Sequence, residues 1–453
     1  MVDGVVVVKR FVYGVIVVGV AVVAIALTVA LWPTKTRSIA IVPSADAVMV
    51  EQGRYLAAAA DCGACHTAAD GQPFAGGVPI ATPIGTVYGS NITPDRATGI
   101  GAYTLDDFDR AVRHGITPAG VTLYPAMPYP SYTRVSDADV AALYAYFMFE
   151  VKPVAAANRA PDIRWPLSIR WPLAVWRKTF VPAIAFDTAR YSDPVVARGA
   201  YLVQGLGHCG SCHTPRALTL QERALDESGS AYLAGGPIID GWVAVNLRGN
   251  SADGLGGWSA DDIEGSLRSA RNASHAVVGE AMNDVVVHST QHLSDADLQA
   301  VAAYLKTLPP SANESSSFAA DPATAQALAA GQEADRGAEL YLDNCAVCHH
   351  SNGAGQTGVF PAIAGNSSVL AADPESLIRL TLHGGQLPST AAAPSNLGMP
   401  GFGWRLSDAE VAELLTFIRR NWGNQAPIVD VARVSAVRRA MNAKGDASGA
   451  DAQ

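Results

Sequence analysis

The hydrophobic pattern begins with one long apolar run, from Phe11 to Trp32, that contains no charged residue. As a helix rising about 1.5 Å per residue it would span about 33 Å, enough to cross the hydrocarbon core of a membrane. A cleaved signal peptide is the alternative. However, the run exceeds the usual apolar core of about 7–15 residues, and the A-x-A sequence at 45–47 lies well beyond it. We therefore predict a cytoplasmic N-terminus over 1–10 and an uncleaved transmembrane anchor over 11–32.

After this run, the same order of elements occurs three times. A glycine and a short apolar helix lead into a cysteine pair in the segments 53–67, 199–215 and 337–350. An amphipathic helix closes each unit, over 135–147, 293–305 and 406–418. The closing helices begin after a hydroxyl residue with an acid three positions on, a pattern that resembles a capping box: Ser136 with Asp139, Ser294 with Asp297 and Ser407 with Glu410.

These repeats predict three helical domains with connecting segments of different composition. Strand patterns are sparse, so the expected fold class is all-α. Long glycine-rich loops are unusual in compact domains, which suggests that each domain is built around a large ligand. The predicted boundaries are domains at 45–152, 191–309 and 331–425, a Trp/Pro-rich linker at 153–190, a flexible linker at 310–330 and a C-terminal tail at 426–453.

Composition bears on the core and on the class of partner. Of the 453 residues, 49% are apolar, which is ample material for packed cores. The formal net charge of −9 argues against a nucleic-acid partner, because such partners require a basic surface.

All six cysteines fall into three C-x-x-C pairs, and a histidine follows each pair directly. Disulfides and zinc sites are the alternatives, but neither requires that histidine. The C-x-x-C-H sequence is the attachment signature of c-type haem, in which both thiols form thioethers and the histidine binds the iron. We therefore predict three covalent haems in three cytochrome c-type domains. The predicted attachment cysteines are Cys62, Cys65, Cys209, Cys212, Cys345 and Cys348, and the predicted proximal ligands are His66, His213 and His349.

Methionine is the expected sixth iron ligand, because a thioether raises the haem potential. Met127, Met282 and Met399 each lie 8 to 12 residues before the N-cap of a closing helix. Histidine is the competing ligand. His114 and His383 occupy matching places in the first and third units, where the second has Ser269, and Met282 has three histidine neighbours: His275, His288 and His292. His350 is expected to be solvent-exposed.

A proximal histidine needs an acceptor for its second ring nitrogen. The backbone carbonyl of Pro361, 12 residues after His349, is the predicted acceptor in the third unit, and Pro79 is its counterpart in the first. The segments 91–108 and 246–263 align without a gap, and Asn91, Tyr103, Asn246 and Trp258 stand at matching positions. These residues either contact the haem or fix loop turns.

The linker contains a stretch, residues 164–180, in which tryptophans alternate with arginines and a lysine. This pattern suits a membrane surface or a partner groove, and a simple strap between domains is the other interpretation.

The chain resembles the three-haem cytochrome c subunits of membrane-bound periplasmic dehydrogenases that oxidise alcohols, aldehydes or sugar acids. The resemblance covers roughly residues 50–425 and is carried by SNITPDRATGIGAYT, YPAMPY, GHCGSCHTPR, the run around GEAMNDVV, and MPGF with RRNWGN. It implies a catalytic subunit with a molybdenum, quinone or flavin cofactor, room for a small additional subunit, and ubiquinone as acceptor. The location implied is the inner membrane, with a single span and haem domains in the periplasm. The predicted anchor favours the aldehyde-oxidising, molybdenum-dependent group.

Two other functions remain open. A stand-alone carrier feeding a terminal oxidase would need no catalytic subunit, whereas a multi-haem peroxidase would need an open iron site. The sequence has no nucleotide fingerprint and no nucleophile motif. We therefore expect no oxidation of organic substrate by this chain alone.

Overall fold

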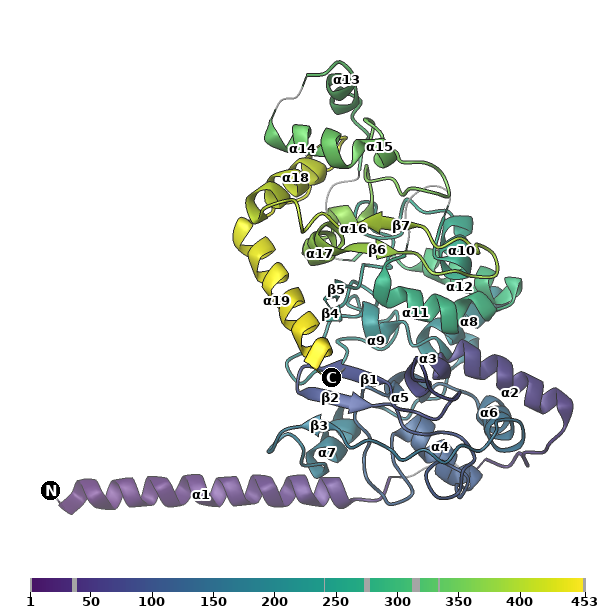
Figure 1. Ribbon diagram of the computed structural model, residues 1–453. Helices are drawn as coiled ribbons and strands as arrows, with labels where there is room; N and C mark the ends of the chain where they lie inside the picture. The colour runs from purple at the N-terminus through teal and green to yellow at the C-terminus, as the bar shows by residue number, and fades with distance from the viewer. Residues whose placement is uncertain are drawn as a thin grey trace. The chain divides into compact units, whose positions relative to one another are not determined.

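Helices account for just under half of the described residues and are the main regular structure in this computed structural model, which describes residues 2–34, 39–239, 241–272, 278–311, 318–332 and 335–450 (Figure 1). The chain divides into two units, one of residues 1–56 and 65–186 and the other of residues 57–64 and 187–453.

The N-terminal helix, α1 (Val2–Leu31), contains the predicted apolar run and ends one residue before Trp32. Its stretch Phe11–Leu31 has a mean hydropathy of 2.9 and none of the most apolar window is buried. Within the described residues it is the one helix that is long and apolar enough to cross a membrane. Its large apolar side chains are mostly exposed, an arrangement typical of a surface that contacts a membrane or a partner.

The elements that follow α1, up to residue 186, belong to the first repeat and its linker. They are α2 (Ala47–Ala59), α3 (Cys62–His66), β1 (Pro79–Thr82), β2 (Gly85–Tyr88), α4 (Leu105–His114), α5 (Tyr129–Tyr132), α6 (Asp137–Phe149), β3 (Asp162–Ile163) and α7 (Trp171–Phe180).

The second unit contains the two later repeats. The first of them has η1 (Thr188–Arg190), α8 (Pro194–Tyr201), the π-helix η2 (Leu202–Leu206), α9 (Gly210–His213), β4 (Ile238–Ile239), β5 (Trp242–Val243), α10 (Ala260–Ser269), α11 (Glu280–His288), η3 (Thr290–His292) and α12 (Asp295–Thr307). The last has α13 (Ala323–Ala329), α14 (Arg336–Asn344), α15 (Ala346–His349), α16 (Ser367–Leu370), α17 (Glu375–His383), β6 (Gly384–Gln386), β7 (Gly398–Pro400), α18 (Asp408–Arg420) and α19 (Val431–Ala450).

Short antiparallel strands qualify the all-α expectation. β1 pairs with β2 in the register Ile80↔Val87, and β3 adds to the far edge of β2 through Gly85↔Ile163. Two smaller hairpins, β4–β5 and β6–β7, lie in the second unit. Strands of two to four residues are too short to give a clear alternating pattern, so the sequence did not reveal them.

The first and last helices of each repeat cross at a glycine. A Cβ on Gly53 would overlap the carbonyl oxygen of Ala142, and one on Gly199 would overlap that of Ala300. Gly337 is similarly close to the carbonyl of Glu413 on α18, where α14 and α18 cross (Figure 1). Only glycine lets the two backbones approach this closely, which explains why each repeat opens with that residue.

A polar pair holds each crossing beside the glycine. The residue before the glycine bonds the acid in the first turn of the closing helix. Gln52 donates to Asp139 at 3.1 Å in the first repeat. Arg198 donates two hydrogen bonds to Asp297, of 2.7 and 2.8 Å, in the second. Arg336 donates to Glu410 at 3.0 Å in the third.

The predicted N-caps are confirmed. The hydroxyls of Ser136, Ser294 and Ser407 accept from the N–H of the acid three residues on. The acid of the third helix, Glu410, also accepts from the N–H of Ser407, which completes a capping box. Each such cap stabilises its helix by about 0.5–2 kcal/mol.

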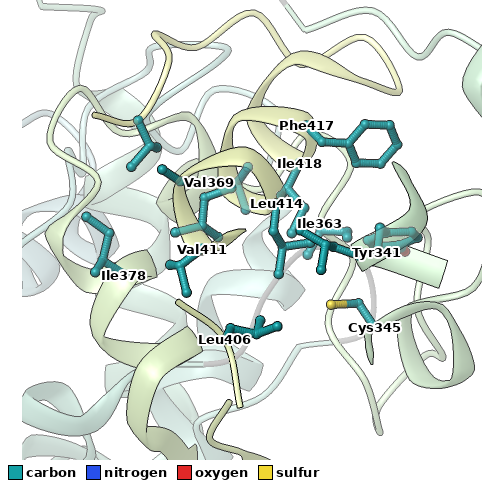
Figure 2. Close-up of a cluster of buried hydrophobic side chains, with 14 of the residues drawn as sticks. Tyr341, Cys345, Ile363, Val369, Ile378, Leu406, Val411, Leu414, Phe417 and Ile418 are labelled. Carbon is teal, nitrogen blue, oxygen red and sulfur yellow. The ribbon is translucent and has the colours of Figure 1, made fainter. Parts of the chain in front are cut away.

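The third repeat has a larger core than its predicted boundary implies. α19, within the segment that we predicted to be a tail, buries Val434 and Val437 against α17 and α18. Trp422 packs on Tyr341 and Phe417, at 4.8 and 5.3 Å between ring centroids. Figure 2 shows the Cys345 sulfur at the edge of this cluster, beside Tyr341. The cysteine pair is therefore anchored directly on packed apolar side chains.

The glycine crossing predicts a selective destabilisation. Gly199→Ala should lower the free energy of unfolding by about 1–3 kcal/mol, because the added methyl overpacks a contact between two backbones. Thermal unfolding followed by circular dichroism measures the change. Gly257→Ala in the same repeat is the matched control, since the nearest atom to its Cβ would lie 4.0 Å away. Equal melting temperatures for the two variants would contradict the interpretation.

Candidate functional site

Each C-x-x-C-H motif forms a single turn of helix that ends at the histidine; α3 contains both cysteines of its motif, whereas Cys209 and Cys345 are the N-caps of α9 and α15. α3, α9 and α15 are four or five residues long and all terminate at the histidine of the motif. In the second and third motifs, the histidine N–H bonds the carbonyl of the first cysteine at 2.9 Å. One helical turn therefore places both thiols and the imidazole on neighbouring positions of one short element.

All three imidazoles are oriented by the same kind of hydrogen bond. Nδ1 of His66 donates to Ser90 O at 2.6 Å, that of His213 to Val245 O at 2.7 Å, and that of His349 to Pro361 O at 2.9 Å. Because a carbonyl only accepts, the ring proton is on Nδ1 and the lone pair is on Nε2. Each ring is thus set to bind a metal through Nε2.

The acceptors confirm one prediction and correct another. Pro361 is the acceptor for His349 as predicted, whereas Pro79 is not the acceptor for His66. Pro79 is the first residue of strand β1. The β1–β2 hairpin lies between Pro79 and Ser90, and the chain reaches His66 only after the hairpin, at Ser90. The third repeat has no hairpin at this point, so its acceptor follows much sooner.

The sequence contained a signal for the two acceptors that we missed. Ser90 and Val245 directly precede Asn91 and Asn246, the first residues of the segments that align without a gap. Each asparagine accepts, through Oδ1, the N–H of the residue two positions on, at 2.9 Å. These two asparagines therefore fix loop turns, and the turns present the preceding carbonyl to the histidine.

Burial sets the protonation of the site. It lowers the pKa of His66, His213 and His349, so these imidazoles are neutral and able to ligate near neutral pH. It also raises the pKa of the Cys209 and Cys345 thiols to about 12. None of the six cysteines forms a disulfide, and within the described ranges no three His, Cys, Asp or Glu side chains gather as a direct metal site would require.

The backbone behind the motif is shaped by glycine. A Cβ on Gly89 would overlap the carbonyl oxygen of Cys65, and one on Gly236 would overlap that of Cys212. The loop thus packs directly against the second cysteine of the motif, and no side chain intervenes.

The candidate methionines share their spacing but not their local structure. Met127 lies in a turn before α5, where its N–H bonds Tyr124 O at 3.2 Å. Met282 is in the first turn of α11, and Met399 lies in strand β7 opposite Gly385. All three side chains are partly buried.

The competing histidines are engaged elsewhere or exposed. His114, Ser269 and His383 are the last residues of α4, α10 and α17, so the predicted correspondence between these positions is confirmed. His114 lies 4.0 Å from the buried carboxylate of Asp109. His288, His292, His350 and His383 are exposed, and His275 lies outside the described residues. This arrangement favours the methionines as sixth ligands.

Comparison with known protein families supports the haem interpretation of this geometry. The cytochrome c family model matches residues 50–148, 196–309 and 334–422, so the chain belongs to the cytochrome c family. The matched segments coincide with the three repeats. Members of this family carry covalently attached haem c.

Three relatives cover most of this chain. It is 52% identical to the gluconate 2-dehydrogenase cytochrome c subunit of Pantoea cypripedii over 90% of this chain and 93% of the relative. It is 52% identical to the cytochrome c subunit of alcohol dehydrogenase (quinone) from Gluconobacter oxydans (strain 621H), over 84% and 80%. The fructose dehydrogenase cytochrome subunit of Gluconobacter japonicus is 37% identical over 87% and 84%. The predicted resemblance to dehydrogenase cytochrome subunits is thereby confirmed.

The residues present fit a covalent haem at each motif. Two thiols that form no disulfide lie one turn apart, and the histidine that follows them is neutral, with its lone pair on Nε2 because Nδ1 donates to a carbonyl. This donor set meets the needs of thioether attachment and of one axial ligand.

The methionine assignment gives a spectroscopic prediction. In Met127→Ala, one haem should lose its low-spin methionine-type absorption, and its reduction potential should fall because the thioether no longer favours reduced iron. Optical spectra and a redox titration of the purified protein measure both effects. Met148→Ala is the control, since Met148 lies partly buried within α6. An unchanged spectrum and potential in Met127→Ala would rule this ligand out.

Proposed function

We propose that this chain is the electron-transfer subunit of a membrane-bound periplasmic dehydrogenase complex. It would pass electrons from a catalytic subunit that oxidises an alcohol or aldehyde, through three c-type haems, to ubiquinone. The observation that carries the proposal is the threefold occurrence of an imidazole oriented by a backbone carbonyl beside a C-x-x-C pair that forms no disulfide. The similarity to dehydrogenase cytochrome subunits along most of the chain supports it.

In this proposal each repeat forms one cytochrome c domain, with the domains at 45–152, 191–309 and 331–425. A bound haem would supply a one-electron carrier at each site. The cysteine pairs 62/65, 209/212 and 345/348 attach the haems, and the proximal ligands are His66, His213 and His349. The sixth ligands are Met127, Met282 and Met399.

The chain's own residues supply three things to these sites. The carbonyls of Ser90, Val245 and Pro361 hold each imidazole in one tautomer and raise its basicity as a ligand. Buried apolar side chains exclude water, which disfavours the charged ferric state and raises the potential. The crossed helices keep the histidine and methionine loops at a fixed separation.

The anchor is proposed to be α1, placed once across the inner membrane with the haem domains in the periplasm. Lys178 on α7 donates from Nζ to the carbonyls of Val29 and Ala30, at 2.6 and 3.2 Å, and also to that of Trp32. These are the carbonyls that a helix leaves unsatisfied at its C-terminus, and a cation there opposes the negative end of the helix dipole. A helix end bonded in this way would suit the membrane surface, where bulk water is less available.

The partner is proposed to be a catalytic dehydrogenase subunit that carries a molybdenum, quinone or flavin cofactor, with room for a small additional subunit. Gluconate, alcohol and fructose, which appear in the names of the relatives, are all hydroxyl compounds. These names favour an alcohol-type substrate for the complex over the aldehyde type that the anchor suggested.

The electron-transfer function is tested by isolating the complex from its native membrane. A larger subunit with its own cofactor should co-purify, and substrate should reduce a ubiquinone analogue through the preparation. The mature chain should carry three porphyrin equivalents by mass spectrometry. The double variant Cys209→Ser/Cys212→Ser should carry two. Fewer than three equivalents in the unaltered chain would overturn the three-haem proposal, and a chain that purifies alone with no such subunit would favour the stand-alone carrier.

The anchor is tested on the same membranes. The mature chain should retain residues 11–31 in its intact mass and should stay with the membrane through an alkaline carbonate wash, because about 20 buried apolar residues insert essentially irreversibly. A mature mass that begins after the apolar run would identify it as a cleaved leader.

A further inference from the structure

The segment 162–180 is part of the first unit and covers the loop that carries Met127. Strand β3 pairs with β2, and Ile163 is buried with Val87 and Tyr124. Leu173 of α7 and Ala126, the residue before Met127, pack against the same cluster. This segment is therefore more than a strap between domains, because it packs against the loop that carries Met127.

Arg177 on this wall is a buried cation with incomplete partners. Its side chain is only 6% exposed. Nη2 donates to Thr34 Oγ1 at 2.8 Å, and Nε has no hydrogen-bond partner. Burial lowers the pKa of Arg177, the phenol of Tyr129 acts in the opposite direction, and no carboxylate of the described chain contributes. An unpaired buried charge costs several kcal/mol, so this arrangement calls for an anion.

A second guanidinium and an unpartnered phenol lie in the same region. Arg170 donates to Thr122 O from Nη2 at 2.6 Å and from Nε at 3.2 Å. Its Cζ lies 3.8 Å from the ring centroid of Tyr124, whose hydroxyl is buried without a partner. The charges of both arginines act on Tyr129, two residues after Met127. Two cations and one hydroxyl donor therefore flank the methionine loop.

We propose that Arg177, together with Arg170 and the hydroxyl of Tyr124, binds the propionate carboxylates of the haem attached at Cys62 and Cys65. The inference rests on the proposed function, because the anion is a propionate of the haem that the proposed function places in the first repeat. Arginine suits the role because its planar fork matches a carboxylate. The burial of Arg177 and Tyr124 beside the methionine loop favours a carboxylate of the cofactor over the phosphate of a lipid headgroup, which is the other possible source of an anion.

The proposal also links the first haem to the anchor. Thr34, which accepts from Arg177, lies three residues beyond the end of α1, and the neighbouring Lys178 bonds the last carbonyls of that helix. The carboxylate edge of the first haem would then lie beside the outer end of α1. This position suits the haem that delivers electrons to an acceptor dissolved in the membrane.

The test is a redox titration of the intact purified chain with chemical mediators, which needs neither the catalytic subunit nor quinone. Arg177→Gln removes a positive charge beside one haem and so should favour its oxidised form. We expect about a tenfold shift in that haem's redox equilibrium, or ~59 mV for one electron. The shifted haem should be the one whose spectrum changes in Met127→Ala. Arg177→Lys, which keeps the charge, should restore most of the potential.

Arg164→Gln is the matched control, because Arg164 is exposed in the same segment; its three potentials should equal those of the unaltered chain. The proposal is overturned if Arg177→Gln leaves all potentials unchanged, including the case in which it instead loses a co-purifying phospholipid. An equal shift of all three haems, indicating general unfolding, also overturns it. None of these results affects co-purification with a dehydrogenase subunit, which is the separate test of the proposed function.

Discussion

The hydrogen bond from each imidazole Nδ1 to a backbone carbonyl is the constraint on which the three candidate sites depend. It fixes the tautomer, and with it the nitrogen that can bind a metal. A carbonyl can do this only if its loop returns to the motif so that the carbonyl oxygen lies within hydrogen-bond distance of Nδ1. The three loops achieve this over 24, 32 and 12 residues, which separate each histidine from its acceptor. The loop therefore differs in length among the three repeats, whereas the position of its acceptor carbonyl beside the histidine is the same.

The helix crossing keeps that position fixed. Because glycine removes the side chain at the contact, the first and last helices of each repeat meet backbone to backbone, and a polar pair at the adjacent position sets their angle. The first helix leads directly into the cysteine pair, and the last one follows the methionine loop. The close packing at this crossing therefore limits movement of the groups on both sides of the site. It thereby limits the structural reorganisation that accompanies electron transfer.

Sequence alone could predict the features that depend on neighbours in the chain. The C-x-x-C-H motifs, the serine N-caps and the Pro361 acceptor all follow from spacings of 12 residues or fewer. The features that it missed are either too short to show a pattern or depend on partners distant in the chain. The hairpin before Ser90 is too short to show a period, and the role of α7 depends on contacts with Thr34 and with the loop before Met127. α19 has a polar composition overall, and its contact with the core consists of two buried valines with Met441 packed beside them.

The segment around α7 shows how one element can serve two needs at once. Two adjacent cations of α7 bond the region where α1 ends: Lys178 donates to the carbonyl of Val29, and Arg177 donates to Thr34 Oγ1. Arg177 is also buried, and its charge interacts with Tyr129, two residues after Met127. Since the two residues are adjacent, a shift of α1 along its axis would move both side chains together. If α1 spans the membrane and Arg177 binds the first haem, as we propose, this link would hold that haem at a constant depth relative to the membrane. Electron transfer to a membrane-dissolved acceptor depends steeply on distance, so such a link would stabilise the rate without any contact between the anchor and the haem itself.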